Sequence, residues 1–352
     1  MILKFVPGHP LLMHILIVKL SSIGDVVHTL PSLAALRRAF PDSYITWIVE
    51  RKAASILENN SYIDQLIEID TRKWRKDLLS RETWQIVRQK LKQIKQRPVD
   101  VALDFQGLLK SGLVAFLSGA ARRIGFESSA LREPASEIFL TDQIAVNRNS
   151  HMIEKNLSLL RALNVTASGR YEFPIAIAPE DEEIVEKQLA KLGAGQFAII
   201  NPGGGWPTKL WRAENYGPLC DWLWERYKLF PLITYGPGEE ALADAVLKSS
   251  KRGCAQKLDL TLKQFVALAR KAKLFVGSDT GPLHLAAAVG TPIVSLFGPT
   301  PAEVNGPFDP NDEVVGRSIP CRVDCYRRSC SHWTCMDIPV EAIKLAVERR
   351  MR

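Results

Sequence analysis

The sequence predicts an α/β fold with two domains, each a parallel β-sheet covered by helices. The chain has 352 residues, of which 46% are hydrophobic and 24% charged, so it is long enough to bury two cores of ordinary size. Short β-branched runs alternate with helical stretches along most of its length, which is the pattern of parallel sheets. This alternation starts afresh after Pro174, so a second domain is expected from there onward.

The first domain is expected over residues 1–174. Its strands are predicted in short apolar runs, at residues 14–19, 44–49, 65–69, 99–104 and 121–125. Its helices are predicted where apolar residues recur every three or four positions, at residues 30–39, 52–59, 108–118 and 151–163. Two interpretations of residues 1–13 stay open: a loose extension before the first strand, or a natural start at Met13. Because this extension contains Pro7 and has no small-residue cleavage site, it does not read as a secretion signal, and we expect a cytoplasmic protein.

The second domain is expected over residues 175–338. Its strands are predicted at residues 197–201, 232–235, 274–277 and 293–297. Its helices are predicted at residues 179–192, 213–226, 239–248, 262–271 and 282–289. Parallel sheets of this kind bind ligands at the carboxyl ends of their strands, so we expect two Rossmann-like domains that face each other across a cleft. A last helix at residues 339–352 is expected to return and pack on the first domain.

Positive charge is concentrated in one segment of the first domain. Residues 72–97 contain ten Lys and Arg against Asp77 and Glu82, which accounts for the whole net charge of +8. The apolar residues of the segment keep a helical period, which predicts one amphipathic basic helix. Two interpretations stay open: a solvated helix face, or contact with an anionic membrane surface. No nucleic-acid motif accompanies the charge, and no apolar run approaches the roughly 20 residues of a membrane span.

The run Asp279-Thr-Gly-Pro-Leu-His284 carries the strongest local signal for a binding site. It follows an apolar strand and opens a helix of small residues. Backbone N–H groups and the helix dipole at such a turn favour a diphosphate, and Gly281 permits close approach. The alternative is an ordinary turn in which Asp279 or Thr280 only caps the helix.

A second loop, residues 201–211, also places glycines after a strand. It reads Asn-Pro-Gly-Gly-Gly-Trp-Pro-Thr-Lys-Leu-Trp, so a ligand could approach its backbone at the carboxyl end of the sheet. Lys209 would then neutralise a phosphate. The alternative is a surface turn without function, since a glycine-rich loop alone is a weak signal.

In the first domain, the turn at residues 19–28 carries a carboxylate, Asp25, between a strand and a helix. A carboxylate is unsuited to face a phosphate. On a cleft it could instead take a proton from a sugar hydroxyl as a general base. The alternative is a helix cap, because an acidic residue near a helix N-terminus is stabilising in any case.

Taken together, these motifs resemble glycosyltransferase family 9, the ADP-heptose:lipopolysaccharide heptosyltransferases. The resemblance covers residues 14–305 and includes the run Asp104-Phe-Gln-Gly-Leu-Leu-Lys-Ser111 and the run Phe297-Gly-Pro-Thr300. The stretch from Arg132 to His151 is more similar to members that add the first heptose, heptosyltransferase I, than to those that add later ones. The resemblance implies a GT-B fold and inverting transfer of heptose from ADP-heptose to an inner-core lipopolysaccharide acceptor, Kdo-lipid A.

The resemblance also implies roles for single residues. Asp25 matches the catalytic base. The donor would be bound by ten residues of the second domain: Asn201, Gly203, Gly204, Thr208, Lys209, Glu239, Asp279, Thr280, Gly281 and His284. The acceptor would be bound by five residues of the first domain: Ser22, Gly24, Gln106, Lys110 and Arg132. The enzyme would be cytoplasmic and peripheral to the inner membrane, which it would contact through its basic helix.

The sequence also bears on cofactors and on other functions. No Asp has another Asp two residues later, so the metal-binding Asp-x-Asp pair of many glycosyltransferases is missing and no cofactor is expected in catalysis. The leaving ADP would be stabilised by backbone dipoles and Lys209. Other functions stay open: a glycosyltransferase with another donor or a protein acceptor, or a non-catalytic protein that binds nucleotide sugars or docks on membranes. A dehydrogenase is disfavoured because no Gly-x-Gly-x-x-Gly follows the first strand.

Four of the six cysteines cluster near the end of the chain, at positions 321, 325, 330 and 335. Such a density predicts a structural zinc or iron site formed by Cys321, Cys325, Cys330 and Cys335. Disulfides and free thiols are the alternatives, and a reducing cytoplasm disfavours disulfides. Cys220 and Cys254 stand alone and are expected to be buried.

Overall fold

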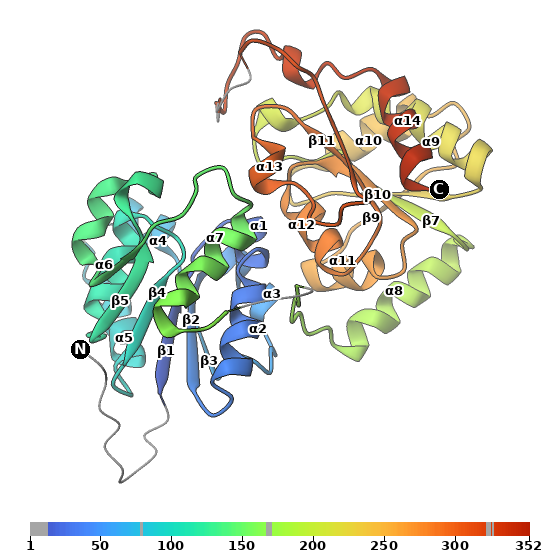
Figure 1. The fold of residues 1–352 in the computed structure, drawn as a ribbon. Helices are drawn as coiled ribbons and strands as arrows, with labels where there is room; N and C mark the ends of the chain where they lie inside the picture. The colour runs from blue at the N-terminus through green and yellow to red at the C-terminus, as the bar shows by residue number, and fades with distance from the viewer. Residues whose placement is uncertain (1–12, 78–79, 167–170, 322–324, 326) are drawn as a thin grey trace. The chain divides into compact units, whose positions relative to one another are not determined.

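The computed structural model describes residues 13–77, 80–166, 171–321, 325 and 327–352. Of the expected extension at residues 1–13, residues 1–12 lie outside the described part. The chain divides into two compact units (Figure 1). Unit 1 comprises Met1–Ser21, Thr29–Arg148 and Ile153–Pro174, and unit 2 comprises Ser22–His28, Asn149–Met152 and Ile175–Arg352.

Unit 1 is built on a six-stranded sheet in the order β3-β2-β1-β4-β5-β6, with every pair parallel. Its strands are β1 (His14–Val18), β2 (Tyr44–Glu50), β3 (Gln65–Ile69), β4 (Val101–Asp104), β5 (Arg122–Phe126) and β6 (Asp142–Ile144). The central strand β1 is buried at all five positions, as expected for a strand covered on both faces. The short edge strand β6 was not predicted.

The helices of unit 1 connect these strands. They are α2 (Leu30–Ala39), α3 (Arg51–Leu57), α4 (Thr71–Lys76), α5 (Arg81–Ile94), α6 (Leu109–Leu117) and α7 (Met152–Leu159), with short 3-10 helices η1 (Ser128–Ala130), η2 (Pro134–Phe139) and η3 (Leu160–Leu163). The basic segment is two helices, so the prediction of one continuous helix was wrong. Asp77 ends α4, and Ser80 caps α5 by accepting a hydrogen bond from the Glu82 backbone N–H at 3.2 Å.

Unit 2 is built on a second parallel sheet, in the order β12-β11-β10-β7-β8-β9. Its strands are β7 (Phe197–Asn201), β8 (Phe230–Thr234), β9 (Gln256–Leu258), β10 (Leu274–Ser278), β11 (Ile293–Phe297) and β12 (Glu313–Gly316). Its helices are α1 (Ile23–Val27), α8 (Pro179–Leu192), α9 (Ala213–Tyr227), α10 (Glu240–Ser249), α11 (Leu262–Ala269), α12 (Gly281–Ala288), α13 (Ala302–Asn305) and α14 (Val340–Arg350), with 3-10 helices η4 (Pro207–Lys209) and η5 (Thr334–Met336). The predicted α/β class with two parallel sheets is confirmed.

Besides the short stretch Asn149–Met152, two helices belong to a different unit from the one predicted. The C-terminal helix α14 was expected on the first domain, but Ile343, Ala346 and Val347 are fully buried in the core of unit 2 with residues of α9 and β11. In addition, Arg349 forms an ion pair with Glu313 of β12. The helix α1, which follows β1 in the chain, clusters with unit 2 through its packing on α12. In both segments the apolar face determines the packing partner, and sequence order does not.

No helix in the described part of the chain has the length and apolar character needed to span a bilayer.

Candidate active site

A buried carboxylate marks the N-terminus of α12. Asp279 follows β10 and is only 6% exposed. Its Oδ2 accepts hydrogen bonds from Lys209 Nζ at 2.5 Å and from Thr300 Oγ1 at 2.6 Å, while its Oδ1 lies 3.2 Å from His284 Nε2. Burial by itself raises the pKa of Asp279, but the His284 hydrogen bond and the Lys209 ammonium outweigh burial and hold this pKa well below its ordinary value. Asp279 therefore stays ionised and binds three other segments of unit 2.

The helix-cap interpretation of this turn does not describe Asp279 or Thr280. Thr280 is the N-cap residue by position, but its side chain makes no capping hydrogen bond. The Asp279 side chain is engaged with Lys209, Thr300 and His284 instead. Gly281 begins α12, and a Cβ there would lie 2.7 Å from Ile23 Cγ2, so only glycine fits beneath α1.

Glu239 holds the glycine-rich loop in place. Its Oε1 accepts from the Gly204 N–H at 3.0 Å, and its Oε2 accepts from the Gly236 N–H at 2.8 Å. A Cβ on Gly203 would lie 2.2 Å from Glu239 Oε2, so the carboxylate requires glycine at that position. Glu239 thus ties together the loops that follow β7 and β8.

The other polar donor residues predicted in this loop form hydrogen bonds or ion pairs with different parts of unit 2. Asn201 is buried and donates to the Thr234 backbone carbonyl at 3.0 Å, so it joins β7 to β8. Thr208 is buried and donates to the Arg327 carbonyl at 2.6 Å. Lys209 lies 4.5 Å from the centroid of the Trp206 ring and forms the ion pair with Asp279. Lys209 is therefore the cation of this loop that the structure places beside the N-terminus of α12.

The predicted base Asp25 acts as a helix cap in this structure. The backbone N–H and the hydroxyl of Ser22 both donate to Asp25 Oδ2, at 2.7 and 2.8 Å. The cap interpretation of Asp25 therefore holds. It does not conflict with a role in proton transfer, because the side chain is half-buried and keeps access to solvent.

The helix that carries Asp25 packs closely on α12. A Cβ on Gly24 would lie 2.2 Å from His284 Cδ2. The His28 ring is 4.5 Å from the His284 ring and 5.3 Å from the His151 ring, measured between centroids. His151 Nε2 in turn lies 2.9 Å from the Gly306 carbonyl oxygen. The structure therefore places Asp25, His284 and Asp279 in one unit.

Sequence reasoning missed His28, His151 and Thr300 as parts of this site. All three lie within or beside the runs that carry the family resemblance, but their spacing along the chain has no regular period. Only the packing of α1 on α12 brings the three histidines together.

The predicted acceptor residues are divided between the two units. Gln106 Oε1 accepts from the Leu20 and Ser21 backbone N–H groups, both at 3.0 Å, so it fixes the chain before α1. Lys110 Nζ forms an ion pair with Glu50 at 3.1 Å. The Arg132 side chain is exposed. These three residues belong to unit 1, whereas Ser22 and Gly24 belong to unit 2.

Asp104 is a buried carboxylate beside Gln106. It accepts from the backbone N–H groups of Gln106 and Gly107, at 2.9 and 3.1 Å, and from Ser111 Oγ at 3.0 Å. Burial raises the pKa of Asp104 to about 6, against the opposing effect of these bonds. Asp104 therefore fixes the turn after β4 and the start of α6.

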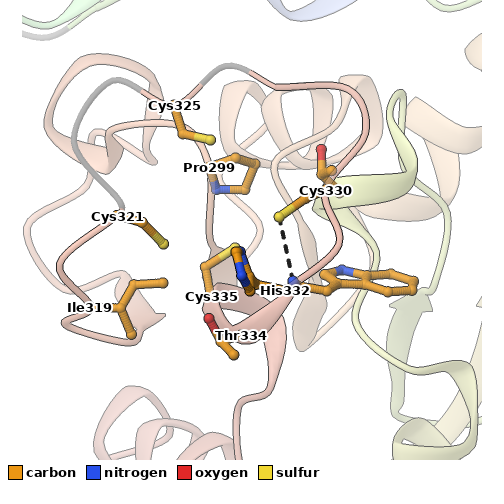
Figure 2. Close-up of a pocket in the computed structure, with 10 residues that line it drawn as sticks. Pro299, Ile319, Cys321, Cys325, Cys330, His332, Thr334 and Cys335 are labelled. Carbon is orange, nitrogen blue, oxygen red and sulfur yellow. Dashed lines mark hydrogen bonds between the residues drawn. The ribbon is translucent and has the colours of Figure 1, made fainter.

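The cysteine cluster lines one small pocket next to the glycine-rich loop. Figure 2 shows Cys321, Cys325, Cys330 and Cys335 around this pocket together with His332. Its volume is about 20 Å³. The four thiols are unpaired, so the disulfide interpretation is wrong for this structure. Among the described residues, no three His, Cys, Asp or Glu side chains are arranged to hold a metal ion.

The cysteine pocket contains a thiol with a lowered pKa and borders a predicted donor residue. Hydrogen bonds from the backbone N–H groups of Trp333 and His332 lower the pKa of the exposed Cys330 thiol, and the Trp333 bond is drawn in Figure 2. Thr208 also lines the pocket. Of the two isolated cysteines, Cys220 is buried and Cys254 is half-buried.

The chain is similar to several known proteins. Residues 87–333 match the sequence model of glycosyltransferase family 9 (heptosyltransferase). The lipopolysaccharide heptosyltransferase 1 of Pseudomonas aeruginosa is 29% identical, over 91% of this chain and 88% of the relative.

Solved structures share the fold. Escherichia coli heptosyltransferase WaaC with ADP has a TM-score of 0.77 and 24% identity, over 96% of this chain and 100% of that chain. The same enzyme with ADP-2-deoxy-2-fluoro heptose has a TM-score of 0.75 and 24% identity, over 96% and 99%. This likeness supports the predicted GT-B fold, and the family match covers more than half of the chain. The chain belongs to glycosyltransferase family 9, the heptosyltransferase family, and is a glycosyltransferase.

Proposed function

We propose that the enzyme transfers heptose from ADP-heptose to an inner-core lipopolysaccharide acceptor, Kdo-lipid A, with inversion and without a catalytic metal ion. The observation that carries the proposal is the packing of α1, with Asp25, on α12, whose N-terminus holds the Asp279–Lys209 ion pair. A proton acceptor and a phosphate-binding turn thus belong to one unit. The donor is supported by the relatives: one is named a lipopolysaccharide heptosyltransferase, and one solved structure contains an ADP-heptose analogue.

The donor diphosphate would be bound at the N-terminus of α12. Backbone N–H groups and the helix dipole favour a negative charge there. Lys209 has three ammonium donors, so it can keep Asp279 while it binds a phosphate oxygen. Asp279 would then position Lys209 and His284, and Glu239 would position the glycine-rich loop. Contact of Glu239 with the ribose of the nucleotide is also part of this proposal.

The transfer would be a single displacement at the anomeric carbon of heptose. The acceptor hydroxyl oxygen forms the new bond to that carbon as the bond to the ADP phosphate oxygen breaks, and Asp25 takes the hydroxyl proton. Charge develops on the departing ADP, where Lys209 and the α12 amides stabilise it. Direct displacement inverts the anomeric configuration. The missing Asp-x-Asp pair supports a reaction in which these groups do what a metal ion does elsewhere.

The decisive experiment compares the wild type with Asp25→Asn. The amide keeps the oxygen that can accept from Ser22 but cannot take a proton. We expect ADP release from ADP-heptose and Kdo-lipid A to fall by about 10²-fold or more, with ADP affinity and thermal stability unchanged. Turnover equal to wild type in this variant would remove Asp25 from the mechanism. Turnover that a chelator abolishes and magnesium restores would contradict the metal-independent step.

The donor and acceptor are tested separately from the chemistry. Thermal stabilisation by ADP but not by UDP or GDP would support an ADP-sugar, whereas preference for UDP would favour the glycosyltransferase with another donor. Binding of ADP-heptose without any ADP release, with Kdo-lipid A present, would favour a non-catalytic protein.

A structural zinc or iron at the cysteine cluster also stays a proposal. The gathering of four thiols and His332 around one pocket supports it, while their present arrangement counts against it. Metal analysis of the purified protein tests it, with Cys330→Ser/Cys335→Ser as the variant and Cys254→Ser as the control. Metal content at one equivalent in the wild type and the control, but not in the variant, is the expected result.

We also propose that the enzyme is cytoplasmic and peripheral to the inner membrane, because its proposed acceptor is anchored in lipid. The exposed basic side chains of α4 and α5 support this contact.

A further inference from the structure

An exposed apolar patch lies on unit 1, on the helix that also carries Lys110. Leu109 and Leu113 of α6 are each 43% exposed, Phe116 of α6 is 51% exposed, and Ile138 of η2 is 75% exposed. We call these four residues the α6 patch. The three residues of α6 are spaced by four and then three positions, so they lie on one face of the helix.

The helix α6 packs closely against η2. The 3-10 helix η2 packs directly on α6, because a Cβ on Gly112 would lie 2.9 Å from the Phe139 ring and 3.1 Å from the Ser136 carbonyl oxygen. The Phe116 and Phe139 rings also pack, with their centroids 5.9 Å apart. The helices α6 and η2, which carry the apolar patch, therefore form one packed surface.

The fold of unit 1 does not require these side chains to be apolar. The opposite face of α6 supplies the core contacts, through the fully buried Ser111 and Ala115. Single exposed apolar residues are common on soluble proteins. Unit 2 also exposes large apolar residues, but they lie on five different segments: Ile184, Trp224, Val314, Trp333 and Leu345. The α6 patch differs because three of its members share one helix face.

The helices next to α6 carry the positive charge of the chain. Trp74 of α4, Leu91 and Ile94 of α5, and Ala115 of α6 join one core cluster, so the three helices cover the same face of the first sheet (Figure 1). Lys110 Nζ lies 3.2 Å from Thr71 Oγ1, which joins the first turns of α6 and α4.

The outward side chains of this helix layer are mostly basic. Eight are exposed between residues 72 and 97: Arg72, Lys73, Lys76, Arg81, Arg88, Lys92, Lys95 and Arg97. Only two exposed acidic residues lie in the same stretch, Asp77 and Glu82. A third acid, Glu133, lies beside α6 and accepts a hydrogen bond from the Leu109 N–H at 2.8 Å. Trp84 of α5 is a further apolar side chain in the layer, at 54% exposure.

We infer that the α4–α5–α6 layer docks on an anionic lipid bilayer, with the α6 patch in the interface and the basic side chains against anionic head groups. Exposed aromatic and aliphatic side chains beside Lys and Arg are the composition of surfaces that bind the membrane interface. A protein partner fits less well, because Lys is depleted from protein interfaces. The inference rests on the proposed function in one respect: a lipid-anchored acceptor would require the enzyme to work at a bilayer.

The test is sedimentation of the full chain with vesicles, using phosphatidylethanolamine–phosphatidylglycerol vesicles and, for comparison, phosphatidylcholine vesicles. The wild type should bind the anionic vesicles and not the neutral ones. Leu113→Gln/Phe116→Gln should lower the affinity for anionic vesicles about tenfold or more, since each substitution removes an apolar side chain that would be buried in the interface. Arg88→Glu/Lys92→Glu should lower it as strongly at low salt, with little difference left at high salt.

Matched controls come from unit 2. Ile184→Gln/Leu345→Gln removes two side chains of similar exposure, at 40% and 56%, and should bind vesicles like the wild type. Unfolding temperatures of all variants should match the wild type, since the altered side chains are exposed. Wild-type binding that does not depend on anionic lipid, or a patch variant that binds like its control, would overturn the inference. Retention of a protein partner, but no vesicles, by the patch would overturn it as well.

The proposed function fails in a different experiment. With a water-soluble fragment of the acceptor, the patch variant should release ADP at the wild-type rate, because no bilayer is needed. Wild-type protein that binds vesicles but transfers no heptose to the soluble or the lipid acceptor would refute the proposed function and leave the docking surface intact. Normal heptose transfer by a protein that binds no vesicles would refute the docking surface and leave the proposed function intact.

Discussion

Replacement of Gly24 by Ala should disturb the site through packing alone. The added Cβ would lie 2.2 Å from Cδ2, 2.8 Å from Nε2 and 3.1 Å from Cγ of His284. Carbon atoms in contact are normally about 3.5 Å apart or more, so α1 and the His284 ring must separate by about 1 Å. The ring is not free to turn aside, because Asp279 binds its Nε2 and the His28 ring lies 4.5 Å away.

The size of the effect follows from this geometry. Overpacking of a buried contact costs about 1–3 kcal/mol, and each 1 kcal/mol lowers the unfolding temperature of a domain of this size by about 2–4 °C. A shift of about 1 Å in α1 also displaces Asp25, and a displacement of that size can lower turnover by about 10²-fold. We therefore expect a moderate loss of stability and a larger loss of activity.

The assay combines a thermal melt with ADP release from ADP-heptose and the acceptor. Gly195→Ala is the control, because its Cβ would meet nothing within 4 Å and its φ is not positive. The control should behave like the wild type or melt slightly higher. If Gly24→Ala also keeps its turnover and unfolding temperature, α1 does not pack on His284, and the positioning of Asp25 by α12 is refuted.

Three further predictions concern charge, pH and the last helix. Lys209→Met should weaken ADP binding about tenfold or more and destabilise the protein by about 3–5 kcal/mol, because it leaves the buried Asp279 without its cation. Calorimetry of ADP binding and thermal melts test this, with the exposed Lys191→Met as the control. ADP binding equal to that of the control would exclude Lys209 from the donor site. The folded-state pKa of Asp104 is about 6 and its ordinary value is 3.8, so its contribution to stability is present below pH 3.8 and is lost as pH rises to about 6. The unfolding temperature should therefore fall less steeply across this pH window in Asp104→Asn than in the wild type. The remaining fall would come from Asp312, whose pKa is also raised to about 6 by burial. An unchanged pH profile in Asp104→Asn would contradict the raised pKa of Asp104. Ile343→Ala should cost about 2–5 kcal/mol because the side chain is fully buried, whereas Leu345→Ala, at 56% exposure, should change stability by less than about 0.5 kcal/mol; equal unfolding temperatures would show that α14 is not part of the unit 2 core.

The buried strands were predictable because apolar runs of five to seven residues leave a strong signal. The strands predicted at residues 197–201 and 293–297 agree with β7 (Phe197–Asn201) and β11 (Ile293–Phe297). The edge strands β6, β9 and β12 were missed. They have three or four residues and mostly half-buried or exposed side chains, so their pairing comes from the neighbouring strand and not from their own composition.

The break in the basic segment illustrates another limit. Apolar residues keep a helical period from Leu78 to Ile94, and this period predicts one helix. Ser80 interrupts it by capping α5. A capping serine in a helical pattern is a signal that periodicity alone does not weigh.

The site was predictable to the extent that it consists of turns after strands. The positions of Asp279, Lys209 and Asp25 at such turns follow from the strand pattern, and the motifs around them carry the family resemblance. Their partners do not, because Thr300, His28 and His151 reach the site from other segments. The sequence left Asp25 open between a cap and a base, and the structure shows the cap bonds from Ser22.

The sequence by itself determined the two parallel sheets, the turns that carry the polar residues and the family to which the chain belongs. The sheets and turns depend on local composition and on the order of strands and helices, which a linear pattern records, and the family follows from the motifs that the chain shares with it. Only the tertiary structure decided that α1 and α14 pack in unit 2, that Glu239 ties two loops together and that the exposed face of α6 lies in a basic layer. Each of these depends on which surfaces meet after the chain has folded, and the distance between two residues along the chain carries no information about that.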